Sequence, residues 1–243
     1  MLCEGGFDTV YEGKRLENGL EVAIKFARKT RNMVCINIPG YPTPLPLEVG
    51  LLLLVNKDPK VPQTIELLDW QDQPDRYIMV LERPSPCEYL FDYVEPCGGT
   101  LSEDVARLVM WQTTYAAYMC YQRGVFHIKL DNLLISPKTL EVKLIDFGCG
   151  DLLRKTGYDI FWGIAEYFPP EYDMEGRYHR KPATVWSLGV LLFVMVCGRY
   201  PKSKDLLEIG LGKWFEPGLS DDCCHLIWYN LPSVDVSGHP STP

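Results

Sequence analysis

A change of pattern at Arg83-Pro84-Ser85-Pro86 most constrains the fold of this chain. The residues before it form short runs of strand-forming residues separated by turns, and the pair Asn18-Gly19 between two such runs is typical of a β-hairpin. After the change, apolar residues recur at helical spacing over long segments, and Ser102 begins the first of them as a helix cap. The sequence therefore predicts an α+β fold with a small β-rich lobe, a larger helical lobe and a ligand cleft between them.

Local patterns also give the expected elements. The closely spaced prolines of 39–46 remove backbone donors, so this stretch is expected to be a loop. A single domain is expected, with residues 1–82 as the N-lobe, 83–87 as the hinge and 88–243 as the C-lobe. Strands are expected at 9–11, 21–25, 65–70, 77–82, 133–135 and 142–145, and helices at 47–55, 102–123, 182–197 and 220–229.

Charge and cysteine content restrict the expected partners and location. The net charge is -8 and the basic residues are scattered, which argues against nucleic acid binding. The nine cysteines form no C-x-x-C pair and are expected to be reduced thiols, as in the cytoplasm or nucleus. The N-terminus lacks the pattern of a signal peptide, and the longest apolar run, 186–198, is too short to span a bilayer. We expect a soluble monomer without a membrane partner.

Several polar motifs follow one another along the chain in a fixed order. A glycine pair between two strands is a weak signal when it stands alone, because a tight hairpin explains it as well. The order of the whole set is more specific, and it resembles the signature set of a protein kinase. The set comprises Glu4-Gly5-Gly6-Phe7-Asp8, Val22-Ala23-Ile24-Lys25, Glu48, Lys129 with Asn132, Asp146-Phe147-Gly148 and Pro169-Pro170-Glu171.

The resemblance covers nearly the whole chain and is strongest to the PIM family of serine/threonine kinases. Pro84 is its most specific mark, because a hinge proline has no N–H to donate to adenine. The other segments that look like PIM kinases are 82–83, 85–86, 90–92, 143–148, 168–171 and 185–189. The resemblance implies a bilobal protein kinase-like fold.

The resemblance further implies a site for ATP and Mg²⁺. Lys25 would hold the α and β phosphates and Glu48 would orient it. Asn132 and Asp146 would bind the metal, since Mg²⁺ prefers oxygen ligands. Gly5 and Gly6 would let the backbone approach the phosphates.

Adenine and substrate contacts are implied in the same way. The hinge carbonyl of Glu82 would accept a hydrogen bond from adenine. Asp92 is assigned to the binding residues as a contact for basic peptides that carry the target Ser or Thr. The apolar walls of the site would be Val10, Ala23, Leu81, Leu134 and Ile145.

The catalytic loop departs from the family spelling H-R-D-x-K-x-x-N, in which the aspartate accepts the proton of the substrate hydroxyl. Lys129 and Asn132 match the motif, but His127 is followed directly by Ile128, as if Arg-Asp had been deleted. The expected base is therefore absent. Asp131 and His127 are the two alternatives for proton acceptor, and each is a poor match in position.

Other departures from the family pattern also indicate impaired transfer. Ile164 replaces a threonine whose hydroxyl would contact the catalytic loop, and Cys3 and Asp8 replace glycines. Asp8 would repel phosphates unless its side chain turns to solvent. Both ends look shorter than in the family: Met1 nearly meets the glycine motif, and the end of the chain lacks the late arginine that would pair with Glu171.

Three interpretations follow from these departures. The chain is a serine/threonine kinase with severely impaired transfer, an ATP-binding pseudokinase that acts as an interaction module, or a relic without function. Residual transfer is compatible with the sequence, because positioning and electrostatics supply most of kinase catalysis.

Overall fold

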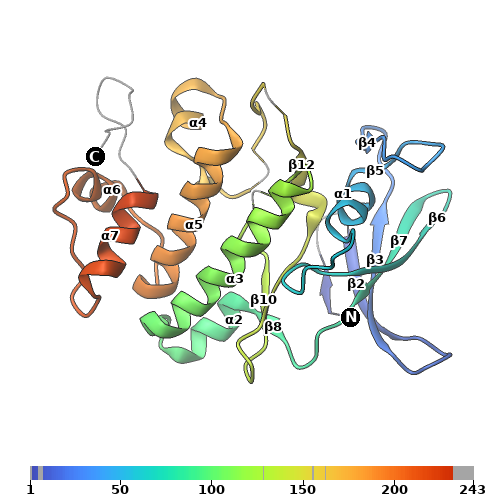
Figure 1. Ribbon diagram of the computed structural model, residues 1–243, viewed down its shortest axis with the longest axis horizontal. Coiled ribbons are helices and arrows are strands. Elements are labelled where there is room, and N and C mark those ends of the chain that lie inside the picture. Colours follow the sequence, from blue (N-terminus) through green and yellow to red (C-terminus); the bar gives the residue numbers. More distant parts are fainter. Residues whose placement is uncertain (1, 5–7, 128, 155, 162, 232–243) are drawn as a thin grey trace.

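The computed structural model describes residues 2–4, 8–127, 129–154, 156–161 and 163–231. A β-sheet with one short helix forms one end of the molecule, and helices form most of the other end (Figure 1). The expected α+β, bilobal fold is confirmed.

The N-lobe is built on an antiparallel sheet with the strand order β1-β2-β3-β7-β6. β2 and β3 form the expected hairpin, with Val10 opposite Lys25 and Gly19 in the turn at φ +72°, where glycine is favoured. Side chains alternate between the two faces of a strand, so Ala23 and Lys25 lie on one face of β3. The strands are β1 (Cys3–Glu4), β2 (Asp8–Lys14), β3 (Glu21–Arg28), β6 (Leu67–Asp72) and β7 (Arg76–Glu82).

Helix α1 (Leu47–Val55) packs beside this sheet and has the bounds that the sequence predicts. The expected loop before it is wrong at its end, because Leu45–Pro46 form the short strand β5, which pairs with β4 (Cys35–Ile36). Proline is tolerated there because a two-residue edge ladder needs few backbone donors. The pairing of β5 with β4 therefore fixes the point at which α1 begins, and this places Glu48 in the first turn of the helix.

The C-lobe is formed mainly by helices. The expected helices are α3 (Glu103–Gln122), α5 (Arg180–Cys197) and α7 (Asp221–Asn230), and Ser102 and Ser220 cap the first and last of them. The expected strands are β10 (Leu133–Ile135) and β11 (Val142–Leu144). The elements that the sequence did not predict are α2 (Leu90–Val94), α4 (Pro170–Glu175), α6 (Ser203–Gly210), β8 (Glu88–Tyr89), β9 (Val125–His127), β12 (Gly150–Leu152) and the short 3-10 helices η1 (Glu95–Cys97), η2 (Phe147–Cys149) and η3 (Ala165–Tyr167).

Helix α5 forms the centre of the C-lobe core. It begins six residues before the apolar run at 186–198, so it is long and apolar enough to cross a membrane by length and composition. However, 67% of its residues are buried inside the protein, as in the core helix of a folded domain. The buried residues include Val190, Leu191 and Phe193, each with 0% exposure.

Backbone and side-chain contacts tie the two lobes together at the back of their junction. The N–H of Leu144 donates to the carbonyl of Gln63 at 2.8 Å, and the N–H of Ile65 donates to the carbonyl of Leu144 at 3.0 Å. Arg123, at the end of α3, donates to the carbonyls of Val55 and Pro59. These contacts fix the sheet and α1 relative to β11.

Candidate active site

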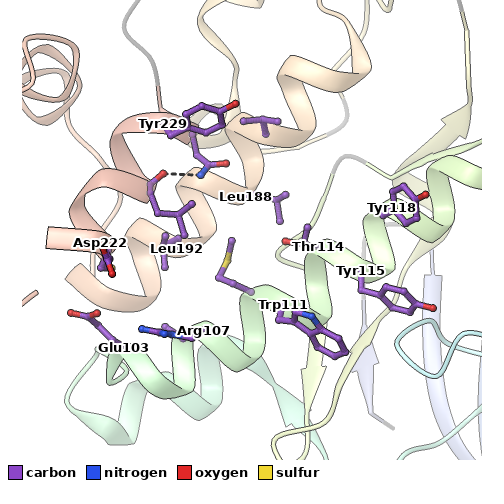
Figure 2. A pocket seen from close by; sticks show the side chains of 16 residues that line it. Glu103, Arg107, Trp111, Thr114, Tyr115, Tyr118, Leu188, Leu192, Asp222 and Tyr229 are labelled. Atoms are coloured by element: carbon purple, nitrogen blue, oxygen red, sulfur yellow. Dashed lines mark hydrogen bonds between the residues drawn. The ribbon is translucent and has the colours of Figure 1, made fainter. Parts of the chain in front are cut away.

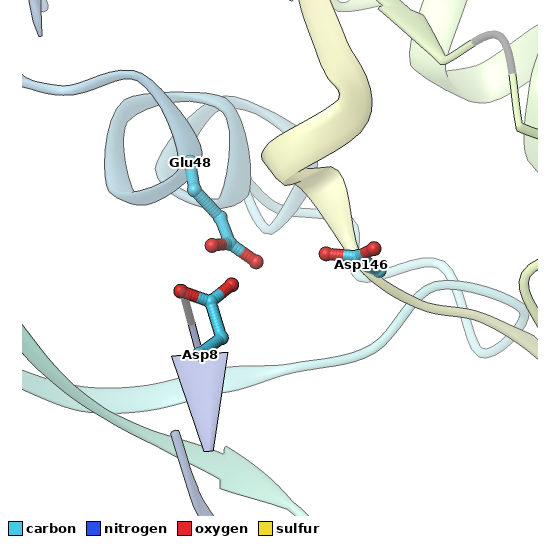
Figure 3. A group of neighbouring side chains, drawn as sticks. All are labelled: Asp8, Glu48 and Asp146. Atoms are coloured by element: carbon cyan, nitrogen blue, oxygen red, sulfur yellow. The ribbon is translucent and has the colours of Figure 1, made fainter. Parts of the chain in front are cut away.

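Lys25 is the centre of the candidate site and is only 6% exposed. Its Nζ lies 2.7 Å from Oε1 of Glu48, 2.9 Å from Oδ1 of Asp146 and 3.0 Å from Oδ2 of Asp8. The three carboxylates come from α1, from the residue before η2 and from β2, and they point toward one another (Figure 3). Residues distant in sequence are thus gathered from both lobes around one ammonium group.

The charged groups of the cluster shift one another's pKa values. Burial lowers the pKa of Lys25, but the nearby carboxylates outweigh it and raise this pKa well above its ordinary value. Burial raises the pKa of Glu48, with Lys25 opposing the shift. Burial also disfavours the ionised form of Asp146, but Lys25 outweighs it and lowers the pKa of that carboxyl. Lys25 and Asp146 are therefore a charged pair at neutral pH.

The backbone around Asp146 aims its carboxylate into the site. Asp146 has φ +58° and ψ 69°, in the left-handed region that Asp tolerates better than most residues. A Cβ atom at Gly148 would lie 3.3 Å from Oε2 of Glu48, so a side chain there would crowd the glutamate. The glycine of the Asp-Phe-Gly sequence at positions 146–148 therefore leaves room for the carboxylate of Glu48.

Asn132 lies next to Asp146, as a shared metal site requires. Its Nδ2 donates to Oδ2 of Asp146 at 3.1 Å, and its backbone carbonyl accepts from the N–H of Ile145 at 2.9 Å. A carboxylate and an amide oxygen fit the oxygen ligands that Mg²⁺ takes in proteins. Asp146 and Asn132 would hold the metal, and the ion would neutralise charge on the phosphates of a nucleotide.

The predicted apolar residues lie near this charged cluster in the fold. Val10 is opposite Lys25 in the sheet, and Ala23 is opposite Leu81. Leu134 on β10 and Ile145, which directly follows β11, come from the C-lobe. All five side chains are half-buried, which leaves part of their apolar surface accessible.

The remaining predicted binding residues have different positions. The carboxylate of Glu82 pairs with Lys143 at 2.6 Å and accepts the N–H of Glu66 at 2.8 Å, so this side chain is engaged outside the Lys25 cluster. Asp92 is exposed in the first turn of α2. Gly5 and Gly6 lie outside the described residues.

The imidazole of His127 points into the protein. It is 3% exposed, and its Nε2 lies 3.0 Å from the carbonyl of Ile145 and 3.2 Å from that of Asp146. Burial lowers the pKa of His127 to about 4, and the ring packs edge-on against Phe147. This geometry is that of a neutral ring that anchors the backbone beside Asp146.

The other residues of the catalytic loop differ in burial. Lys129 is half-buried, and its carbonyl accepts the N–H of Asn132 at 3.1 Å. Oδ1 of Asp131 is buried and has no hydrogen-bond partner among the described residues. Burial raises the pKa of Asp131 above its ordinary value.

Two further departures are visible in the C-lobe. Ile164 is 41% exposed, so an apolar side chain stands at the expected threonine position. Oε1 of Glu171 is buried and, within the ranges that the structure describes, has no hydrogen-bond partner. This oxygen of Glu171 is therefore an unsatisfied acceptor in the described part of the C-lobe.

The sequence did not predict two features of the structure, a contact of Cys149 and a second pocket. Sγ of Cys149 lies 3.7 Å from Oδ2 of Asp146, and no sequence pattern gave that contact. A pocket of about 820 Å³ lies away from Lys25, between α3, α5 and α7 (Figure 2). Its signal was present in the sequence, because Trp111, Tyr115 and Tyr118 recur at helical spacing on α3.

Comparison with known proteins gives consistent matches. A family model described as "Protein kinase domain" matches residues 1–210. "Serine/threonine-protein kinase pim-2" of Danio rerio is 38% identical over 255 aligned residues, which cover 99% of this chain and 82% of the relative. "Serine/threonine-protein kinase prk-2" of Caenorhabditis elegans is 38% identical over 202 residues, or 82% of this chain and 44% of the relative. "Serine/threonine-protein kinase SIK1" of Mus musculus is 33% identical over 204 residues, or 82% of this chain and 24% of the relative.

Proposed function

Because the chain belongs to the protein kinase family, with serine/threonine kinases of the PIM type among its relatives, we propose that it binds ATP and Mg²⁺ between its lobes. We further propose that its transfer of phosphate to protein Ser or Thr is severely impaired. The observation that carries the binding proposal is the contact of Lys25 with both Glu48 and Asp146, at 2.7 and 2.9 Å.

Each part of the cluster has a task in this proposal. Lys25 binds the α and β phosphates, and Glu48 keeps its ammonium in place. Asp146 and Asn132 hold the metal, which when bound screens the charge of the phosphates. Half-buried apolar side chains from both lobes contact the adenine, and the backbone carbonyl of Glu82 accepts its amino hydrogen.

The impairment follows from the missing proton acceptor. His127 is buried and directed at backbone carbonyls, and Oδ1 of Asp131 is buried, so we assign neither residue the role of base. We assign Lys129, which is half-buried, to contact the transferred phosphate. Loss of a general base typically costs about 100- to 10,000-fold in rate.

The second candidate function is an interaction module that binds ATP without turnover. The buried, neutral His127 favours it, because this ring stabilises the site but offers no exposed proton acceptor. Protein partners with basic Ser/Thr motifs would approach near the exposed Asp92. A monomer in the cytoplasm or nucleus, without nucleic acid or membrane partners, remains our expectation.

Binding and transfer can be tested separately. ATP with Mg²⁺ should raise the unfolding temperature, and EDTA should reduce the increase. Radiolabelled ATP should give little transfer to a basic Ser-containing peptide, and Lys25→Met should remove whatever transfer exists. Failure of ATP to shift the unfolding temperature at any Mg²⁺ concentration would contradict the binding proposal.

A gain-of-function variant tests the cause of the impairment. Inserting Arg-Asp between His127 and Ile128 restores the family spelling and should raise transfer by about 100-fold or more. Inserting Arg-Asn at the same place is the matched control, because it restores the length but not the carboxylate. Equal transfer by both insertions would show that the missing base is not the limiting defect.

A further inference from the structure

Asp8 occupies a position in the site that the proposed function does not explain. It is the first residue of β2 and is paired with Ala27 of β3, which brings its carboxylate to the ammonium of Lys25. The distance from Oδ2 to Nζ is 3.0 Å, and the Asp8 side chain is 35% exposed. The alternative in which this side chain turns away to solvent is not the one observed.

The ammonium of Lys25 is already paired before any ligand arrives. Glu48 and Asp146 each accept a hydrogen bond from Nζ, and Asp8 adds an ion pair. An ammonium has three N–H donors, so a phosphate oxygen must displace one of these carboxylates or share a donor with it. Asp8 is the natural group to be displaced, because Glu48 is only 12% exposed and Asp146 is also bonded to Asn132.

The charge balance also disfavours a polyphosphate. Three carboxylates surround one ammonium, so the cluster carries an excess of two negative charges when all four groups are ionised. Charges a few ångströms apart in a partly buried site interact much more strongly than they do in water. Each phosphate charge brought to Lys25 therefore meets the carboxylate of Asp8, whereas an uncharged nucleoside does not.

We propose that Asp8 is a specificity-determining residue that competes with phosphates for Lys25 and shifts the selectivity of the site from ATP toward uncharged adenine ligands. The proposal rests on the proposed adenine site between the lobes. The ligands that Asp8 favours over ATP are nucleosides and other neutral adenine-like molecules. ADP should lie between adenosine and ATP in its response to Asp8.

Calorimetric titration of adenosine, ADP and ATP tests this selectivity. Asp8→Asn keeps the shape of the side chain and removes its charge, and Glu17→Gln removes an exposed carboxylate in the β2–β3 turn as a control. Asp8→Asn should strengthen ATP binding about tenfold, which corresponds to ~1.4 kcal/mol, and change adenosine binding less than about twofold. Glu17→Gln should change neither, and the gain for ATP should shrink at 1 M salt.

The outcomes separate this inference from the proposed function. Adenosine binding that Asp8→Asn leaves unchanged, together with equal ATP affinity in both proteins, overturns the role of Asp8 but keeps the adenine site. Weaker binding of ATP with Mg²⁺ by Asp8→Asn also overturns it, because Asp8 would then help to hold the metal. No binding of any of the three ligands by any variant overturns the proposed function and the inference with it.

Discussion

Lys25 links the two lobes through charge as well as through any ligand that it binds. It is nearly buried, and its ammonium neutralises Glu48 from α1 and Asp146 from the segment before η2. A buried ion pair adds little net stability compared with apolar packing, but loss of one partner leaves an uncompensated charge. The cluster should therefore be more important for stability than its size implies.

Substitution of Lys25 tests this structural role. Lys25→Met removes the ammonium and leaves three carboxylates within a few ångströms of one another, so the free energy of unfolding should fall by about 3–5 kcal/mol. Urea unfolding at pH 7 measures the change. Lys14→Met, on the exposed end of β2, is the control and should change stability by less than about 0.5 kcal/mol. Equal stability of Lys25→Met and wild type would contradict the inferred coupling of the cluster.

The motif residues could be placed from the sequence, but their contacts could not. Lys25, Glu48, Asn132 and Asp146 stand in a recognisable order, and the structure brings these four together. The contact between Asp8 and Lys25 depends on side-chain direction at the start of a strand, which position in a motif does not determine. The orientation of His127 likewise depends on carbonyls that lie 18 and 19 residues further along the chain.

At the scale of elements, the length of a helix or strand determined how well the sequence could predict it. Helix α3 is long enough to show a helical period, and α1 is an apolar run that follows the proline-rich loop; the bounds of both agree with the sequence within about one residue. The strands β9 and β12 pair only through three residues each, so neither shows a clear alternation. Helix α6 was missed because its N-cap residue is Lys202, which is not a usual cap, and its beginning is held instead by Asp205 in its first turn, which accepts the N–H of Lys202 and pairs with the nearby Arg199.

Asp205 fixes that helix in a pH-dependent way. It is 8% exposed, its carboxylate accepts from Arg199 at 2.6 and 2.9 Å, and it also accepts the N–H of Lys202 at 2.7 Å. The hydrogen bond from Arg199 lowers the pKa of Asp205 below its ordinary value. Because the folded-state pKa is the lower one, this stability is fully present above about pH 4 and is lost as the pH falls through the lowered value.

Asp205→Asn should accordingly reduce the free energy of unfolding by about 1–3 kcal/mol at pH 7. The difference from wild type should become smaller as the pH falls below about 4, because the unfolded wild-type protein then binds a proton at Asp205 before the folded protein does. Urea titrations at pH 7 and pH 3 measure both values. Glu208→Gln breaks the exposed pair with Lys204 and should cost less than about 0.5 kcal/mol. A deficit for Asp205→Asn that is constant with pH would contradict the charge-based explanation.

Gly189 controls how closely α5 and α7 approach. A Cβ atom there would lie 2.8 Å from Cβ of Asn230 and 2.9 Å from Cγ of Leu231, which is closer than packed atoms allow. Alanine favours a helix over glycine by up to about 1 kcal/mol, but overpacking costs about 1–3 kcal/mol. Gly189→Ala should therefore destabilise the protein by about 1–2 kcal/mol in urea unfolding. Gly210→Ala, at the exposed end of α6, is the control and should not destabilise it.

At the scale of the whole molecule, the described residues include two candidate regions for the adenine ligand that we propose. One is the junction around Lys25, which includes residues of both lobes. The other is the pocket between α3, α5 and α7, whose exposed aromatic side chains include Trp111 and Tyr229 (Figure 2). Thermal stabilisation alone does not distinguish them, because any ligand that binds only the folded state raises the unfolding temperature.

Hydrogen exchange resolves the location. Adenosine at about 100 times its dissociation constant should stabilise the folded protein by about 2.7 kcal/mol. If it binds between the lobes, amide exchange should slow in β2 and β3 and also around Phe147–Cys149, because the ligand would connect elements that Lys25 and its carboxylates bring together. Exchange in α7, which lines the other pocket, should not slow beyond the change in global stability. Tyr229→Ala should leave the effect of adenosine intact, since Tyr229 is 75% exposed and belongs to that other pocket. Protection centred on α7, and its loss in Tyr229→Ala, would place the ligand in the helical pocket and contradict an adenine site between the lobes.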